Sequence, residues 1–289
     1  MVFSRARTRF AVLPPCGLPV SRQSFRDIHV DSGRYDELLA EMQMFRGKVY
    51  LSDGALRPGD LINGCHRLSI DERSWHVLSL DSDGRVSACL RYLPHLNPCG
   101  LDDLWVRDAA LADCPKFGSH FRRAVEAEIR HAKEMKLGFG EVGGWAVSEE
   151  FRRSLEALRV ILTSYALGQV LGGCSGVATA TLRHGSAGIL RRIGLNPLQW
   201  DGATLPPYYD ERYGCQMEVL RFDTRFPNSN YQELVTELSA ALAESPVICY
   251  DTRQKDREGV CDGCLYGDSS SGCGTWAPRN GLVALGAHA

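Results

Sequence analysis

The stretch that decides the fold contains VGGWAV (142–147), VATATL (177–182) and SAGILRRIG (186–194). The first two segments are typical of short strands. Between them, Ser148 is followed by two glutamates and then by apolar residues at helical spacing as far as Gly172, which predicts a helix. A second helix is predicted in the third segment, because Gly194 ends its apolar pattern. Strand, helix, strand and helix in this order predict a mixed α/β sheet.

Upstream of this stretch the sequence predicts a hairpin and two helices. Residues 75–80 and 86–93 have alternating patterns and are separated by an Asp-Ser-Asp-Gly turn, which is typical of a β-hairpin. Apolar residues at helical spacing predict helices at 35–45 and 121–135. The first helix places Arg46 at its end, where the guanidinium points toward whatever site lies beyond.

Downstream, the sequence predicts a strand at 216–222 and a helix at 231–244, and near the N-terminus it predicts a strand at 10–13. The fold class is therefore predicted as α/β, with a mixed (α+β) sheet. Three regions are expected: an N-terminal arm (1–34), one catalytic domain (35–250) and a flexible tail rich in Cys, Gly and Ser (251–289).

Composition excludes several classes of protein. The 33 basic and 35 acidic side chains leave a formal net charge of −2, which argues against nucleic acid as a partner. The sequence has no apolar run of about 18 residues, so no membrane-spanning helix is expected. Eleven cysteines, most of them scattered singly, do not form the framework of a secreted disulfide protein, and we expect a cytoplasmic location.

The segment 186–195 resembles the helix of GNAT acyltransferases that has the pattern N/S-x-x-A-x-x-x-Y-x-x-x-G-F. The front half is similar, within that superfamily, to acyl-homoserine-lactone synthases and N-acyl amino acid synthases. Three pieces carry this similarity: Arg46-Gly47-Lys48-Val49-Tyr50, Arg91-Tyr92-Leu93-Pro94, and Glu141 ahead of Trp145-Ala146-Val147. The resemblance covers residues 35–226 and implies a GNAT-like fold.

Two departures from the GNAT pattern concern the acyl donor. Where acetyl-CoA-dependent relatives have a glycine-rich turn that holds the pyrophosphate, residues 151–157 read FRRSLEA. Either Arg152 and Arg153 compensate as phosphate ligands, or the donor is an acyl carrier protein rather than free coenzyme A. In addition, the family tyrosine that protonates the departing thiolate falls at Leu190, which has no proton to give.

The resemblance implies roles for the residues around the central strand. Glu141 is the candidate catalytic base for the acceptor amine; the alternative is a linker carboxylate that faces solvent. Gly143 and Gly144 allow a bulge whose N–H groups face the oxyanion and the donor amides, or else they are small packing residues at a strand end. Trp145 and Val147 complete the expected donor-binding strand, and for Trp145 a core position is the alternative.

A second group of residues is expected to bind the acceptor. The guanidinium groups of Arg46 and Arg91 match a carboxylate bidentately, and the alternative is two arginines in surface salt bridges. Asp71 is a candidate ion-pair partner for one of them. A basic rim of Arg152, Arg153 and two later arginines is expected to meet a phosphate or an acidic carrier protein.

No metal site and no permanently bound cofactor are expected. Cys261, Cys264, Cys273 and His288 offer only one close cysteine pair, so an unstructured tail is favoured over a zinc site. The predicted function is an N-acyltransferase that moves an acyl group, expected to be fatty acyl, from a carrier-protein or coenzyme A thioester to the amine of a small molecule such as an amino acid. The alternatives are an acyl-homoserine-lactone signal synthase and a non-catalytic GNAT-fold module that binds an acyl carrier or a protein.

Overall fold

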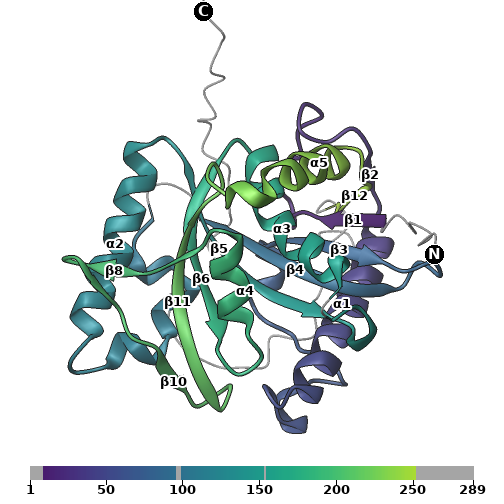
Figure 1. Ribbon diagram of the computed structural model, residues 1–289. Coiled ribbons are helices and arrows are strands. Elements are labelled where there is room, and N and C mark those ends of the chain that lie inside the picture. The colour runs from purple at the N-terminus through teal and green to yellow at the C-terminus, as the bar shows by residue number, and fades with distance from the viewer. Residues whose placement is uncertain (1–8, 96–98, 153, 252–289) are drawn as a thin grey trace, which may run out of the picture.

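The computed structural model describes residues 9–95, 99–152 and 154–251, which form a single large sheet with helices on both faces (Figure 1). The sheet has the order β10-β11-β6-β5-β4-β3-β1-β12-β2, with β7 paired to β11, and β8 and β9 form a separate ribbon. The strands are β1 (Arg9–Leu13), β2 (Ile28–Val30), β3 (Trp75–Leu80), β4 (Val86–His95), β5 (Gly138–Val147), β6 (Cys174–Thr181), β7 (Asn196–Pro197), β8 (Gln199–Trp200), β9 (Ala203–Thr204), β10 (Tyr208–Asp210), β11 (Cys215–Asp223) and β12 (Val247–Cys249). The helices are α1 (Ser32–Ser52), α2 (Gly118–Glu134), α3 (Leu155–Val170), α4 (Ser186–Ile193) and α5 (Gln232–Ala243). The predicted mixed α/β fold is confirmed.

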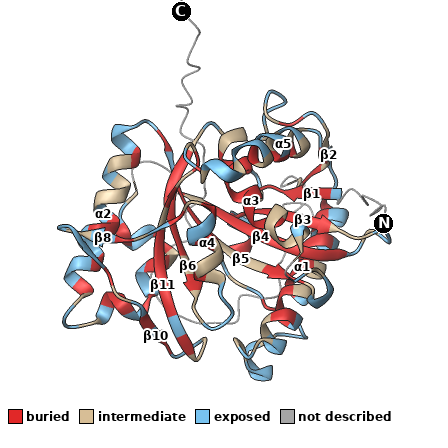
Figure 2. Ribbon diagram, viewed as in Figure 1, coloured by how far each residue is buried: buried red, intermediate tan, exposed pale blue. Residues whose placement is uncertain are grey.

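The strands of the sheet are largely buried (Figure 2), because their side chains alternate between two apolar layers. On β6, Val177 packs in the cluster beneath α2, whereas its neighbour Ala178 packs in the cluster beneath α3 and α5. A third cluster joins α1 to the β1, β3 and β4 end of the sheet. Burying apolar side chains on both faces fixes the register, because a slip of one residue exchanges the two faces.

The N-terminal segment that we predicted as an arm contributes two strands to this sheet. β1 pairs antiparallel with β3 and parallel with β12, and β2 pairs parallel with β12. The strand predicted at 10–13 is therefore confirmed and lies inside the sheet.

Helix α1 is longer than predicted. Asp31 caps its first turn by accepting a hydrogen bond from the Arg34 N–H, and the helix continues to Ser52. Gly47 does not end it. A glycine fits here because the helix lies so close to the loop before β3 that a Cβ at this position would be 3.0 Å from the Gly64 carbonyl oxygen. The prediction that Arg46 ends this helix is thus wrong, and Arg46 lies within it.

Two other boundaries differ from the predicted ones. The helix expected to start at Ser148 starts at Leu155, because the Ser154 hydroxyl accepts hydrogen bonds from the next turn, and a 3₁₀ turn (Glu149–Phe151) precedes it. Strand β5 begins at Gly138, four residues earlier than predicted. Glu141 therefore lies within a strand and is not a linker residue.

No helix in the described ranges is both long and apolar enough to cross a membrane.

Candidate active site

The candidate site forms where strands β5 and β6 separate. These strands pair in parallel from Gly138 and Cys174 to Val142 and Ala178, and beyond that point both continue without pairing to each other. The backbone of β5 also bulges here, since the register with β4 jumps from Ala146 to Gly143. The bulge predicted for the two glycines is thus present, and Gly144 has φ +62, a conformation that favours glycine.

A cavity of about 150 Å³ occupies this gap and reaches both faces of the sheet. On the α1 face, Arg46, His66 and Arg91 line it; on the opposite face, Ile161 and Leu190 do. Its wall also includes Tyr50, Asp53, Trp105, Val142, Gly143, Gly144, Trp145, Thr179, Ala180, Thr181, His184, Ser186, Tyr213 and Met217. Residues from both faces of the sheet therefore meet around one point.

Arg46 and Asp71 form a buried ion pair, as predicted for Asp71 and one of the two arginines. Arg46 is fully buried, and its guanidinium donates bidentately to Asp71 at 2.7 and 3.1 Å. Asp71 also accepts from Gln43 Nε2 and from the Leu68 N–H. Burial alone would raise the pKa of Asp71, but the charge and hydrogen bonds of Arg46 outweigh burial, and the net pKa is lowered. Asp71 thus orients Arg46 from behind and is not among the wall residues of the cavity.

Arg91 is buried on the cavity wall without a carboxylate partner among the described residues. It is 6% exposed, and its Nε and Nη1 atoms donate to no hydrogen-bond acceptor in that part of the chain. Burial and the nearby charge of Arg46 lower its pKa. A desolvated guanidinium of this kind is unfavourable unless an anion pairs with it, so the structure favours an anionic ligand at this wall.

Glu141 is buried beside the cavity, one strand position below Val142. Its Oε1 lies 2.7 Å from His95 Nε2 and accepts the Trp105 N–H at 2.6 Å, while its Oε2 accepts the Val106 N–H at 2.7 Å. The carboxylate therefore holds the 3₁₀ turn Trp105–Asp108 against β5. Glu141 does not itself line the cavity.

Only some of the other predicted donor-binding residues line the cavity. Gly143, Gly144 and Trp145 line the cavity, whereas Val147 is buried in the core beneath α3 and does not. Arg152 does not line the cavity, but it forms a 2.7 Å ion pair with Asp53, which does. Arg153 lies outside the described residues.

Sequence reasoning missed several wall residues. Tyr50 is the last residue of the RGKVY motif, and its hydroxyl donates to the Trp145 carbonyl. His66, Trp105 and Tyr213 come from loops and turns far apart in sequence, so no spacing pattern marks them.

Two buried histidines next to this site predict loss of stability in acid. Burial lowers the pKa of both His66 and His76 to about 4, with Arg46 adding to the effect at His66. Because the unfolded value is about 6.5, each histidine stabilises the fold fully above that pH, and this contribution is lost as pH falls from about 6.5 through 4. We expect each histidine to lower the free energy of unfolding by about 3 kcal/mol across that range. Urea denaturation at pH 7.5, 5.5 and 4.5 measures the loss.

The matched control for this prediction is His76→Gln. Glutamine retains a donor for the Asp71 carbonyl, which His76 Nε2 approaches at 2.9 Å, but it does not titrate. The variant is expected to lose less stability than the wild type between pH 6.5 and 4. An equal loss in both proteins would show that other groups dominate the acid transition.

No group of three or more His, Cys, Asp or Glu side chains in the described ranges is arranged to hold a metal ion. Cys261, Cys264, Cys273 and His288, which we weighed as zinc ligands, lie outside those ranges.

Comparison of the sequence with protein-family models and with curated proteins finds no match. Comparison of the structure finds similar solved structures, among them the CoA-dependent acyl-homoserine lactone synthase BjaI with SAM and isopentyl-CoA (14% identity, 84% of this chain and 93% of that chain, TM-score 0.48). Others are FeeM, an N-acyl amino acid synthase from uncultured soil microbes (8% identity, 68% and 88%, TM-score 0.42), and a putative N-acetyltransferase from Lactobacillus plantarum (10% identity, 64% and 90%, TM-score 0.39).

Proposed function

We propose that this protein is a GNAT-type N-acyltransferase that moves an acyl group from a thioester to the amine of a small, carboxylate-bearing molecule. The observation that carries the proposal is the cavity between β5 and β6. Residues from both faces of the sheet line it, and on the α1 face two nitrogens of the buried Arg91 have no hydrogen-bond acceptor among the described residues. Acyl transfer without a covalent enzyme intermediate requires such an arrangement, because donor and acceptor must meet at one point in a fixed orientation.

The donor approaches from the α3 and α4 face. Ile161 of α3 and Ser186 and Leu190 of α4 line this side of the cavity. Arg152, which pairs with the wall residue Asp53, is the proposed ligand for the phosphate of a phosphopantetheine arm. Both coenzyme A and an acyl carrier protein present such an arm. The bulge at Gly144 offers backbone N–H groups to the oxyanion of the tetrahedral intermediate.

The acceptor binds on the α1 face, where the Arg91 guanidinium takes its carboxylate and Arg46 lies beside it. The amine nitrogen attacks the thioester carbonyl carbon, a C–N bond forms, the C–S bond breaks and the thiol leaves. The amine loses one proton in this step. Glu141 lies next to the cavity but not on its wall, so it is the proposed base through one intervening water; its Oε2 accepts a single hydrogen bond from the described residues and retains a lone pair. Leu190 has no proton for the thiolate, so we assign that role to Tyr213, a hydroxyl on the cavity wall.

The proposal is tested by mass spectrometry of small-molecule extracts from cells that express the wild-type protein or Glu141→Gln. New N-acylated species that disappear in the variant support the transferase and identify acyl group and acceptor. Release of methylthioadenosine would instead identify a homoserine-lactone synthase. A folded, well-expressed protein that forms no new species would favour a module that binds an acyl carrier without catalysis.

Asp53→Asn is expected to improve donor binding. The Asp53 carboxylate pairs with the Arg152 guanidinium in the free protein. Removing the charge of Asp53 therefore frees the guanidinium to bind a donor phosphate. We expect the donor KM to fall about two- to fivefold, the range for a partly exposed ion pair. Arg152→Ala is expected to raise the donor KM. Steady-state kinetics at low and high salt measure the donor KM of both variants. If the two variants change the donor KM in the same direction, the ion pair serves only the structure.

A further inference from the structure

The cavity at the proposed reaction point is small. Its volume of about 150 Å³ is comparable to an internal cavity that binds one benzene molecule. The amine, the carboxylate and the side chain of an acceptor must share this space with the reacting carbonyl group. A space of this volume matches an acceptor with few non-hydrogen atoms.

A much larger cavity, of about 830 Å³, lies next to it, and Trp105 is the residue that lines both. The larger cavity has an apolar floor that includes Ile70, Leu93 and Leu104. Its rim includes Asp102, Asp103 and Arg107. Trp105 is thus shared by the walls of the cavity at the reaction point and of a second cavity more than five times its volume, whose wall is part apolar and part charged.

Trp105 is held in place by a buried carboxylate. Glu141 accepts the Trp105 N–H at 2.6 Å and the Val106 N–H at 2.7 Å, and His95 lies 2.7 Å from the same carboxylate. Val106 is itself 2% exposed, so the turn is anchored on both its backbone and its apolar side chain. A wall residue fixed in this way resists displacement by a bulky substrate.

We propose that Trp105 is the residue that sets the upper size limit of the acceptor, which makes small α-amino acids such as glycine and alanine the preferred acceptor class. This inference rests on the proposed acyl transfer. Removing the indole joins the two cavities and admits a large apolar acceptor side chain onto the Leu93 and Leu104 floor.

Isothermal titration calorimetry of the full chain with N-octanoylglycine and N-octanoylphenylalanine, two products of the proposed reaction, tests this limit without turnover. The wild type is expected to bind the glycine compound at least about tenfold more tightly. Trp105→Ala is expected to bind the phenylalanine compound about 10- to 100-fold more tightly than the wild type does, because a phenyl side chain then becomes buried. Trp105→Phe is expected to lie between the two.

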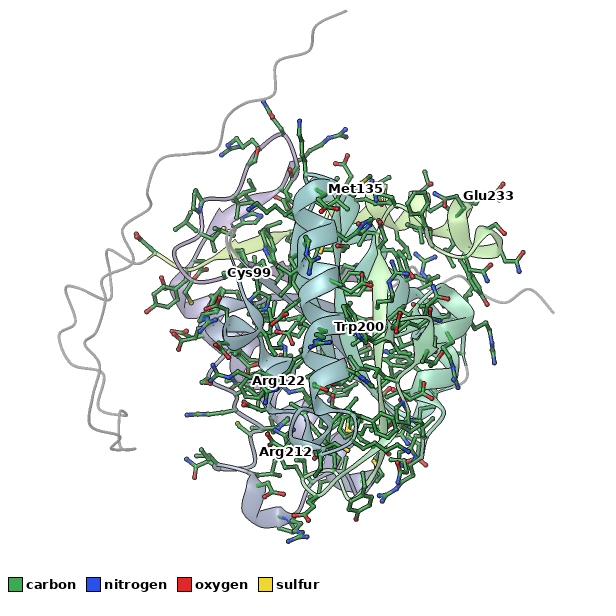
Figure 3. All side chains as sticks on the ribbon, turned by 90° about the vertical axis from the view of Figure 1, so that its left-hand side faces the viewer. Cys99, Arg122, Met135, Trp200, Arg212 and Glu233 are labelled. Carbon is green, nitrogen blue, oxygen red and sulfur yellow. The ribbon has the colours of Figure 1, made fainter. Side chains whose placement is uncertain are left out.

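The matched control is Trp200→Ala. Trp200 belongs to the β8–β9 ribbon and lies next to α2 (Figure 3). The Arg123 guanidinium lies over its ring at 6.0 Å from the centroid, and Trp200 is not a wall residue of either cavity. This variant is expected to keep the wild-type preference. The proposal is overturned if Trp105→Ala keeps the wild-type ratio of the two affinities, or if neither compound binds any of the proteins.

Failure of the proposed function is separable from failure of this inference. If Trp105→Ala removes the size preference but cell extracts contain no acylated product, then Trp105 limits the size of a binding pocket and the transferase function is rejected. New acylated products together with an unchanged affinity ratio would retain the transferase and reject the role of Trp105.

Discussion

Replacing Arg91 with methionine is expected to lower kcat/KM for the acceptor by roughly 100- to 1,000-fold while making the folded protein more stable. The loss follows from removing the only partner proposed for a buried substrate carboxylate, because buried charge pairs are costly to break. The gain in stability follows because two nitrogens of this guanidinium are buried without an acceptor among the described residues. Methionine fills a similar volume without a charge, and we expect the free energy of unfolding to rise by about 1–3 kcal/mol. Acceptor kinetics and urea denaturation measure the two effects.

A substitution that lowers activity but raises stability identifies a binding residue, whereas a substitution of a structural residue lowers stability. Arg225→Met provides the comparison, since the Arg225 guanidinium donates from Nε and Nη2 to the Asp223 carboxylate. That variant is expected to lose stability and to keep its acceptor KM. If Arg91→Met loses stability as Arg225→Met does, then Arg91 pairs within the protein, and the assignment of the acceptor carboxylate to it fails.

Replacing Asp71 with alanine is expected to destabilise the protein by about 3–5 kcal/mol, because it leaves the fully buried Arg46 charge without its partner. The Gln43 amide and the Leu68 N–H lose their acceptor as well. For a domain of this size such a change lowers Tm by about 10 °C. Arg46 lines the cavity, so acceptor binding is expected to weaken along with stability.

A double variant tests whether the loss of stability comes from the unpaired Arg46 charge. In Arg46→Met/Asp71→Leu both charges are absent, and replacing a buried pair with apolar residues is often close to neutral, so most of the stability is expected to return. Asp210→Ala is the matched single variant, because its partner Arg212 is half exposed and returns to water; its cost is expected to be about 1 kcal/mol or less. Equal losses in Asp71→Ala and Asp210→Ala would show that the Arg46 pair is not energetically special.

The order of strands and helices was predictable because it depends on local patterns. The hairpin of β3 and β4, the helices α3 and α4 and the strand between them follow from alternation, helical spacing and Gly194. Boundaries were less certain where a tertiary contact overrides a local signal. Gly47 lies inside α1 where the helix closely approaches the Gly64 carbonyl, and the hydroxyl of Ser154 rather than Ser148 starts α3.

Candidate site residues were also accessible from the sequence, since the resemblance to acyltransferase motifs singles out Arg46 on α1, Arg91 on β4 and Glu141 on β5. The arrangement of these residues could not be predicted from the sequence. It depends on where β5 separates from β6 and on which side chains lie close enough to a hydrogen-bond partner. Only the tertiary structure pairs Arg46 with Asp71, leaves Arg91 unpaired on the cavity wall and turns Glu141 toward the Trp105 backbone. Periodicity along the chain determined the elements, whereas the cavity is lined by residues that lie as much as 171 positions apart, from Arg46 to Met217, and no local pattern encodes such a meeting.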